Sequence, residues 1–427
     1  MNAIEKRNHC ISCGSNLSED IVFIGDQFPS AIFLSDDAPP PPELKSSSLN
    51  LSRCTNEDCQ LIQLSNHYNL QYVFDHYPYE SGTTATMKKI LQDVVDDAQS
   101  VVNLSSDDVV LDIGGNDGTM LGLIKQPVRT RVNIDAAAGV AQTVSDPNYV
   151  HIHTQFNAEA YLALDLPKPK LITSVAMFYH LSDPLAFVKD VCKIMDNQSV
   201  WVLQMTYVGT MLRDNIIDNI VHEHVAYYSL SSLKHLLSQA GLQIADAKIV
   251  ESYGGSLRVF IVKDKSAYPD LKWRKEIGHV ESFETENKTN TVEALREFDT
   301  RAQLLRSTLK ASVNHLATRC GPLWGFGAST KGNMILQFIG ATNKEIPCIL
   351  DNSLKKIGSK TTGTLIPIVS ESEYLKNPPR YLMVLPYYYT STFVKIIGNN
   401  LKQGTQLDLF VPLPFPHYVP VPSREML

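Results

Sequence analysis

The chain has 427 residues, 44% of them hydrophobic, and carries 38 Lys and Arg against 45 Asp and Glu, a formal net charge of −7 at pH 7. This length predicts about two or three domains. The acidic balance argues against a nucleic-acid partner. Because no apolar run approaches about eighteen residues, no membrane span is expected. The first ten residues lack the apolar stretch of a secretory signal, so we expect a cytoplasmic protein.

Four of the seven cysteines lie before residue 60. Cys10 and Cys13 form a C-x2-C pair, and Cys54 and Cys59 form a C-x4-C pair. In a reducing compartment such pairs favour a tetrahedral zinc site over two disulfides. Four thiolates leave no open position for chemistry, so we expect a structural ion in a small N-terminal module over residues 1–70. His9, next to Cys10, is an alternative ligand or else a solvated neighbour.

The segment 76–87, HYPYESGTTATM, precedes a helix expected over 87–101. Thr83 or Thr84 is expected to cap that helix. A polar, aromatic helix entry with Tyr77, Tyr79 and Ser81 can form one wall of a pocket. The alternative is an ordinary loop with a packed tyrosine.

The segment 109–122, VVLDIGGNDGTMLG, predicts a buried strand, a glycine turn and a helix over 119–124. A second strand over 132–134 ends in Asp135, where an acid commonly binds ribose hydroxyls. The order D-x-G-G-x-D-G resembles motif I of S-adenosylmethionine (SAM) methyltransferases. SAM carries no phosphate, so Asp112 can face its cationic methionine end. The alternative is a glycine turn in another nucleotide-binding sheet. The expected cofactor contacts are Asp112, Gly114, Gly115, Asn116, Asp117, Gly118, Asp135, Phe156, Met177 and Phe178.

Further β/α alternation follows, with strands expected over 151–156, 171–178 and 201–205. His180 follows the second of these strands, at the edge where parallel sheets bind ligands. The sequence H-E-H, His222 to His224, would place its two histidines on one face of an extended backbone. A metal site there lacks a third ligand at a suitable spacing. An acid–base role is favoured, because a carboxylate beside a histidine fixes its tautomer and tunes its pKa.

The segment 281–319 is charged, periodic and free of Gly and Pro, which predicts one long helix. A second strand, glycine loop and helix follow over 323–339, and the next strand, 346–350, ends in Asp351. We therefore expect a second Rossmann-like domain over 281–427. Its Lys331 and Lys356 are expected to bind a diphosphate as point charges; the alternative is a domain that only packs. The tyrosines at 387–389 are expected either to stack on a sugar or base or to fill core.

The order of these motifs resembles that of the SAM-dependent sugar C-methyltransferases, which act on nucleotide-linked 4-keto-deoxysugars. The shared features are the four cysteines, Y-P-Y-x-S-G-T at 77–83, D-I-G-G-N-D-G at 112–118, H-E-H-x-x-Y-x-S at 222–229 and G-x-G-A-x-x-K-G-N at 325–333. They cover nearly the whole chain. The resemblance implies an α/β protein with a zinc-binding module (1–70), a central SAM-methyltransferase Rossmann-like domain (71–280) and a C-terminal Rossmann-like domain (281–427) that binds the substrate nucleotide. Val221 stands where the family often has Tyr.

The resemblance also implies residue roles. His224 is the expected base, and the other expected catalytic residues are Glu223, His180, Tyr77 and Tyr79. A dTDP- or GDP-sugar is expected to contact Ser81, Thr83, His222, Tyr228, Lys331, Asn333 and Lys356. The chemistry is consistent with these roles, because C-methylation needs an enolate, and a 4-keto group acidifies the C3 hydrogen enough for a histidine of pKa about 6.5 to remove it. Tyr or His donors at the ketone oxygen would stabilise the enolate.

Two other functions remain open at this point. One is O- or N-methylation of another small molecule, with zinc as a scaffold. The other is a non-catalytic zinc-binding adaptor with a SAM-like fold, against which the intact D-x-G-G-x-D-G and Asp135 argue. The expected assembly is a monomer or a small homo-oligomer.

Overall fold

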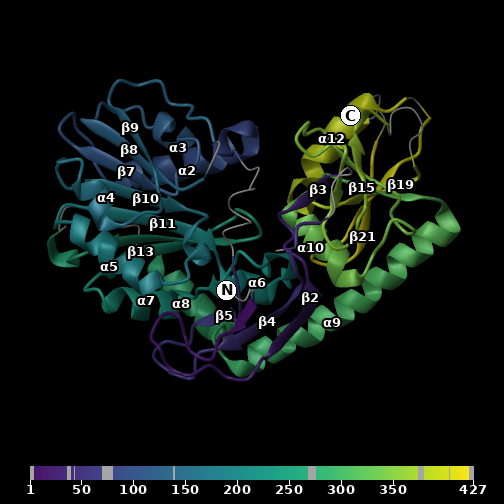
Figure 1. Cartoon of the computed structure of the whole chain (residues 1–427), viewed down its shortest axis with the longest axis horizontal. Helices are drawn as coiled ribbons and strands as arrows, with labels where there is room; N and C mark the ends of the chain where they lie inside the picture. The colour runs from purple at the N-terminus through teal and green to yellow at the C-terminus, as the bar shows by residue number, and fades with distance from the viewer. Residues whose placement is uncertain are drawn as a thin grey trace.

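A computed structural model of the chain describes residues 4–35, 40–42, 44–69, 80–137, 140–267, 276–373, 379–402 and 404–422. Two α/β lobes lie side by side, and the N-terminal strands lie below and between them (Figure 1). A long helix, α9 (Val292–His315), runs along the outer edge of the C-terminal lobe (Figure 1). The chain therefore has the α/β architecture expected from the sequence.

The first lobe is built on a seven-stranded sheet in the order β13-β14-β11-β10-β7-β8-β9. The pairs from β11 to β9 are parallel, whereas β14 is antiparallel to β11 and β13. Every residue of β7 is buried, as a parallel strand covered on both faces requires. The strands are β7 (Val109–Ile113), β8 (Thr130–Asp135), β9 (Tyr149–His153), β10 (Leu171–Val175), β11 (Val200–Thr206), β13 (Gln243–Val250) and β14 (Ser256–Val262).

The helices of this lobe begin where the sequence places their caps. The Thr84 hydroxyl accepts from the Met87 amide at 3.2 Å, and Ser229 forms a capping box with Ser232. The helices are α2 (Ala85–Val101), α3 (Thr119–Leu123), α4 (Ala158–Leu162), α5 (Pro184–Ile194), α6 (Val208–Arg213) and α7 (Leu230–Ser238). Short 3₁₀ turns interrupt them at η1 (Ser81–Thr83), η2 (Phe178–His180), η3 (Ile217–Asn219) and η4 (Lys265–Ala267).

The N-terminal strands join the rest of the molecule by pairing with distant segments. One sheet has the order β12-β5-β4-β2, so β12 (Ala226–Tyr227), which follows the H-E-H sequence, pairs with β5 (Ile62–Leu64). Strand β3 (Phe33–Ser35) instead pairs with β17 (Ser359–Thr361) of the second lobe. The remaining strands here are β1 (Ile4–Lys6), β2 (Val22–Gln27), β4 (Ser47–Arg53) and β6 (Asn66–Tyr68).

The second lobe contains a six-stranded sheet in the order β18-β16-β15-β19-β20-β21, antiparallel only at β20–β21. Its strands are β15 (Leu323–Phe326), β16 (Ile349–Asp351), β18 (Ile368–Ser370), β19 (Tyr381–Val384), β20 (Asp408–Val411) and β21 (His417–Pro420). Its other helical elements are α10 (Thr330–Ile339), α12 (Thr390–Asn400) and the turn η6 (Tyr387–Tyr389). This second strand–glycine loop–helix unit has the Rossmann-like form expected.

The prediction of a single helix over 281–319 is wrong. The structure has α8 (Ile277–Glu286), a break, α9, and a final π-helical turn, η5 (Leu316–Cys320). Lys288 in the break adopts a left-handed backbone with φ +48°, and the Thr291 side chain caps α9 by accepting from Ala294. The break contains neither Gly nor Pro, so the helical periodicity of the sequence appears continuous across it.

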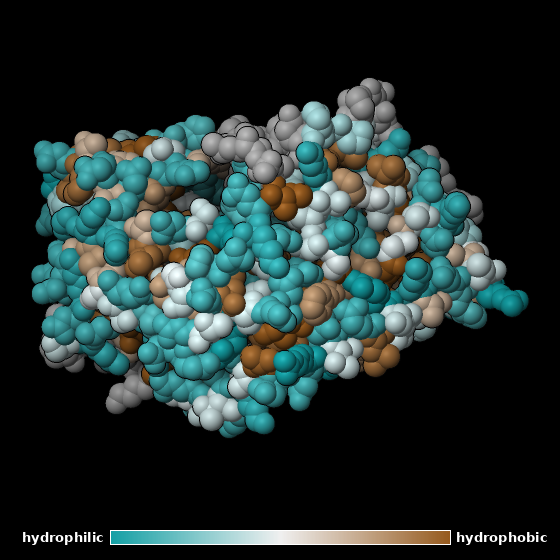
Figure 2. Space-filling model, turned by 60° about the horizontal axis from the view of Figure 1, so that its bottom comes forward, coloured by the Kyte–Doolittle hydropathy of each residue, from teal (hydrophilic) through white to brown (hydrophobic). Residues whose placement is uncertain are grey.

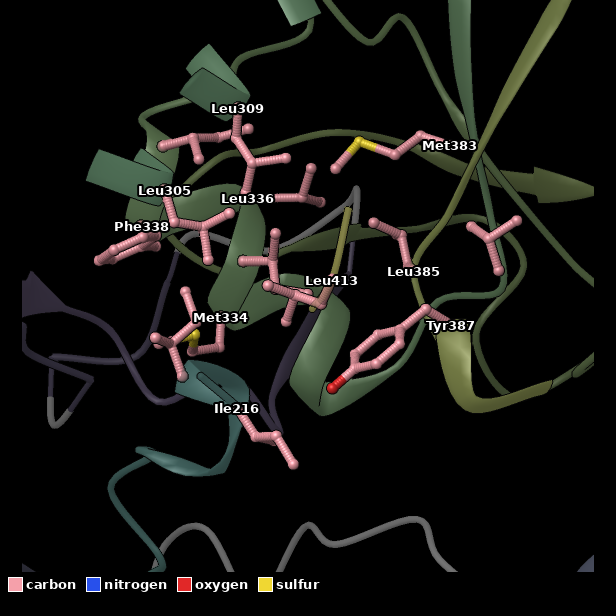
Figure 3. Packing of buried hydrophobic residues seen from close by; sticks show 14 of the residues in the cluster. Ile216, Leu305, Leu309, Met334, Leu336, Phe338, Met383, Leu385, Tyr387 and Leu413 are labelled. Carbon is pink, nitrogen blue, oxygen red and sulfur yellow. The ribbon is translucent and has the colours of Figure 1, made fainter. Parts of the chain in front are cut away.

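One hydrophobic core joins the N-terminal sheet, α6, α9 and the second lobe. In Figure 3, Leu305 and Leu309 of α9 lie beside Leu336 and Phe338 of α10, and Ile216 of the first lobe approaches Met334. Fully burying a side chain of this size stabilises the fold by roughly 1.5–3 kcal/mol. The shared core therefore fixes the two lobes against each other.

On the face shown in Figure 2, hydrophilic residues predominate and the hydrophobic ones form small separate groups. Within the part of the chain that the structure describes, every helix is too short or too polar to cross a membrane.

Candidate active site

The glycine turn after β7 is packed too closely against neighbouring side chains to accept a Cβ at Gly114 or Gly115. Gly114 has φ +74°, and a Cβ on it would lie 2.8 Å from the Met177 side chain. A Cβ on Gly115 would lie 2.5 Å from Asn133 Oδ1 and 2.6 Å from Asp112 Oδ2. The backbone is thus packed against polar side chains at the carboxyl end of β7, where an open parallel sheet binds its ligand.

Two acids flank this turn. Asp112 is buried and accepts a hydrogen bond from the Thr173 hydroxyl at 2.8 Å, and burial raises its pKa to about 7. Asp135, at the end of β8, accepts from the amides of Asn116 at 2.8 Å and Ala137 at 2.6 Å. Asp135 therefore shapes the loop with both carboxylate oxygens.

Ser81 and Gly82, from the segment expected to form a pocket wall before α2, contact the glycine turn directly. The Ser81 amide donates to Asn116 Oδ1 at 2.9 Å, and the Gly82 amide donates to Asp117 Oδ2 at 2.7 Å. Thr83 is exposed, and its hydroxyl donates to the Glu80 carbonyl. The predicted residues Tyr77 and Tyr79 lie outside the described residues.

The three aromatic and sulfur-containing contacts expected for the cofactor lie around the end of β10. Phe178 is fully buried and packs on Trp201, with ring centroids 5.9 Å apart. Phe156 is partly buried against Phe187, and Met177 faces Gly114. Met177 therefore lies directly at the glycine turn.

The H-E-H sequence forms a turn, which corrects the expectation of an extended backbone. The His224 amide donates to the Val221 carbonyl at 3.1 Å and closes the turn, and the Val225 amide bonds to the Tyr179 carbonyl. All three side chains are buried. The alternation argument fails here, because pairing with β5 begins only at Ala226.

His224 is held at one ring nitrogen. Its Nδ1 lies 2.7 Å from the Asn219 carbonyl oxygen, which can only accept, so Nδ1 carries the proton and Nε2 is the basic nitrogen. Its ring centroid is 4.2 Å from that of Tyr179 and 5.5 Å from that of His180. His180 and His224 are 44 residues apart in the sequence. The structure brings them together, as the family resemblance led us to expect.

Burial sets the charge states of this cluster. It lowers the pKa of His180 and of His222 to about 3, and it raises the pKa of Glu223 to about 7. For His224, burial, His180 and Lys331 together hold the pKa well below the usual value. All three imidazoles are therefore neutral at neutral pH.

Several buried polar atoms near H-E-H have no hydrogen-bond partner among the described residues. They include both ring nitrogens of His222 and Oε2 of Glu223. Two N-terminal residues that the sequence did not indicate, Gln27 and Ser30, also carry such atoms, and so does Asn333 of α10, whose amide donates to the Ser30 carbonyl at 3.1 Å. Because an unpaired buried polar atom is costly, this group is suited to a polar ligand.

The two predicted lysines of the second lobe already have protein partners. Lys331 Nζ donates to Asn219 Oδ1 at 2.5 Å, beside the H-E-H turn. Lys356 Nζ donates to the Ala328 carbonyl at 2.6 Å and lies 3.9 Å from Asp351. Lys331 thus joins the second lobe to the candidate site.

Tyr228 lies on another side of the turn. Its ring packs against Phe178, and burial together with the nearby thiols of Cys10 and Cys59 raises its pKa well above the usual value. Its buried hydroxyl has no hydrogen-bond partner among the described residues.

The four N-terminal cysteines meet in space, with all sulfurs within 4.8 Å of one another. The Sγ atoms of Cys10 and Cys59 are 3.7 Å apart, and those of Cys13 and Cys54 are 3.5 Å apart. A tetrahedron with Zn–S bonds of 2.3 Å has sulfurs about 3.8 Å apart, so the set fits zinc. Strand β5 begins three residues after Cys59 and pairs with β12, which connects this cluster to H-E-H.

Comparison with known proteins identifies the chemistry of this site. A family described as "Methyltransferase domain" matches residues 84–247, and one described as "C-methyltransferase C-terminal domain" matches residues 251–414. The C-methyltransferase NovU of Streptomyces niveus is 25% identical over 367 residues, 86% of each chain. The chain is a SAM-dependent methyltransferase, and over most of its length it is similar to C-methyltransferases. The family expected from the motif order is thus confirmed, and the adaptor interpretation is set aside.

Solved structures similar to this C-methyltransferase align with less than half of it. The N-methyltransferase NodS from Bradyrhizobium japonicum is 13% identical, covers 42% of this chain and 97% of its own, and gives a TM-score of 0.32. The YcgJ protein from Bacillus subtilis is 16% identical, covers 40% and 97%, and gives 0.30. The assignment to the C-methyltransferases rests on the family matches and NovU.

Proposed function

We propose that this C-methyltransferase methylates C3 of a nucleotide-diphosphate 4-keto-deoxysugar through an enolate, with His224 as the base. The observation that carries the proposal is the 2.7 Å contact between His224 Nδ1 and the Asn219 carbonyl. It leaves Nε2 unprotonated in a buried site, where a neutral imidazole can accept the C3 proton. A C-methyltransferase needs such a base, because a C–H bond is not nucleophilic.

The glycine turn is proposed to hold SAM, which supplies an electrophilic methyl group when bound. Asp112, Gly114 to Gly118 and Asp135 would line it, with Phe156, Met177 and Phe178 at the neighbouring strand end. The position of the turn at the carboxyl end of the buried parallel strand β7 supports this placement, because open parallel sheets bind their ligands at that edge. The zinc ion is proposed to be structural, bound by Cys10, Cys13, Cys54 and Cys59.

Stabilisation of the enolate oxygen is proposed to come from a neutral donor. His180 is neutral, because burial lowers its pKa to about 3, and its ring lies 5.5 Å from that of His224. A neutral imidazole can donate one N–H to an oxyanion without competing for the substrate proton. Tyr77 and Tyr79 remain proposed donors, and Glu223 is proposed to act as a proton carrier.

The substrate is proposed to lie between the H-E-H turn and the C-terminal domain, residues 281–427. The unpaired buried atoms of His222, Gln27, Ser30 and Asn333 support a ligand rich in hydroxyl and carbonyl groups. Ser81 and Thr83 would bound the sugar on the SAM side, and Lys331 and Lys356 would face the dTDP or GDP diphosphate. Tyr228 remains a proposed substrate contact, because its buried hydroxyl also has no hydrogen-bond partner among the described residues.

Deuterium wash-in tests the proposal. The protein is incubated in heavy water with a SAM analogue that cannot donate methyl and with dTDP-4-keto-6-deoxyglucose or its 2-deoxy relative, and the C3 proton is followed by NMR. We expect exchange with the unmodified protein and with His235→Gln, on α7, and none with His224→Ala. Exchange that persists in His224→Ala rejects His224 as the base. Absence of exchange with either keto-sugar, while SAM still binds, rejects the substrate class.

A further inference from the structure

A fully buried carboxylate lies one residue before Asn219. Asp218, in the turn η3, has no exposed surface. Its Oδ1 accepts from the Tyr387 hydroxyl at 3.1 Å and its two oxygens accept from the Tyr388 hydroxyl at 3.2 Å. Lys331 Nζ lies 4.0 Å from Oδ2. All three partners belong to the second lobe, in η6 and α10.

Asn219, the next residue, contacts the second lobe through its side chain and His224 through its backbone. The side-chain oxygen of Asn219 accepts from Lys331 Nζ at 2.5 Å. Its backbone oxygen lies 2.7 Å from His224 Nδ1 and also accepts from the Tyr227 hydroxyl at 3.4 Å. The turn η3 thus connects the second lobe on one side to the imidazole of His224 on the other.

Tyr388 packs closely against the backbone at Gly254. A Cβ on Gly254, in the hairpin between β13 and β14, would lie 2.8 Å from Tyr388 Cε1 and 2.7 Å from Ile216 Cδ1. Its φ of +84° also favours glycine. A buried carboxylate is unfavourable unless it is paired, so Asp218 requires these hydroxyls and Lys331 to stay where they are.

We propose that Asp218 is a positioning residue: by binding Tyr387, Tyr388 and Lys331, it holds the Asn219 carbonyl at the distance that fixes the tautomer of His224. This rests on the proposed role of His224 as the base. The second lobe therefore does more than bind the substrate nucleotide. Its contact with η3 determines whether Nε2 of His224 is the proton acceptor.

The first test reads the tautomer without any turnover. Protein labelled with ¹⁵N-histidine is compared with Asp218→Asn and with the milder Tyr388→Phe, and the His224 signals are assigned by their loss in His224→Ala. We expect a protonated Nδ1 in the unmodified protein and a mixed or reversed tautomer in both variants. Tyr389→Phe is the matched control, because that ring packs on Phe393 and its hydroxyl is not among those that reach Asp218.

The second test separates rate from binding. We expect Asp218→Asn and Tyr388→Phe to slow C3 exchange by about ten- to a hundredfold, with KM changed less than twofold; this is at most the low end of the roughly 10²–10⁴-fold that a general base contributes, because the base is misoriented and not removed. Unchanged tautomer and rate in Tyr388→Phe, with the thermal midpoint retained, overturn the proposal. A slower rate with an unchanged tautomer also overturns it. If His224→Ala still exchanges, the base assignment fails instead, while the spectra still report whether η3 sets the tautomer.

Discussion

Adding one methyl group at Gly115 tests the geometry of the proposed SAM site. Gly115 is not in the left-handed region, so Gly115→Ala introduces a steric change without backbone strain. The new Cβ would lie 2.5 Å from Asn133 Oδ1 and 2.6 Å from Asp112 Oδ2. Each oxygen would have to move by about 0.8 to 0.9 Å to reach an ordinary contact.

Neither side chain is free to move that far. Asp112 is held by the Thr173 hydroxyl, and the Asn133 amide donates to the Asn116 carbonyl, Gln142 and Tyr149. Overpacking of this kind costs about 1–3 kcal/mol. We therefore expect the free energy of unfolding to fall by about 2 kcal/mol and SAM affinity to fall at least tenfold, which corresponds to about 1.4 kcal/mol.

Isothermal calorimetry with SAM and urea unfolding measure the two effects. Gly122→Ala is the control, because its Cβ would meet only Val144 at 3.5 Å, and alanine in a helix should be neutral or stabilising by about 0.5–1 kcal/mol. If Gly115→Ala bound SAM as tightly as Gly122→Ala with unchanged stability, the placement of SAM at this turn would be refuted.

Three further outcomes follow from the structure. Cys59→Ser, or a chelator, should remove the proposed zinc ion and lower both the thermal midpoint and activity, because β5 supports β12 beside H-E-H; metal content and activity retained together would contradict this. Burial keeps the pKa of His224 well below 6.5, so this proposed base stays unprotonated as pH falls, and an NMR titration of its ring should have its midpoint below pH 6.5; a midpoint at or above 6.5 would contradict this. Phe298→Ala, in the fully buried part of α9, should lower the free energy of unfolding by about 3–5 kcal/mol in urea titrations, against a change within about 0.5 kcal/mol for exposed Leu304→Ala.

Local patterns predicted the parts of the fold that depend on neighbours in sequence. The buried run before Gly114, the cap at Thr84 and the spacing of the four cysteines each carry their own physical signal. The family resemblance added the pairing of His180 with His224, because it brought in motif order as well as spacing.

The misses arise where distant segments decide the outcome. The H-E-H residues form a turn because the residues that follow them pair with β5 and bond to Tyr179. These long-range contacts leave no periodic pattern in the sequence. The break at Lys288 has no Gly or Pro. Gln27 and Ser30 look like ordinary polar residues until α10 packs over them and Asn333 reaches Ser30. Asp218 gains its partners from tyrosines about 170 residues later.

The pairing of β3 with β17 has a consequence for synthesis on the ribosome. Phe33 of β3 pairs with Thr361 of β17, 328 residues further along the chain. At about 5–20 residues per second, that partner emerges roughly 15 to 60 seconds later. The seven-stranded sheet of the first lobe can form during this interval. The apolar residues of β3 meanwhile remain exposed, because β17 has not yet been synthesised. Translation speed and chaperone supply should therefore limit the yield of this enzyme more through its first residues than through its last.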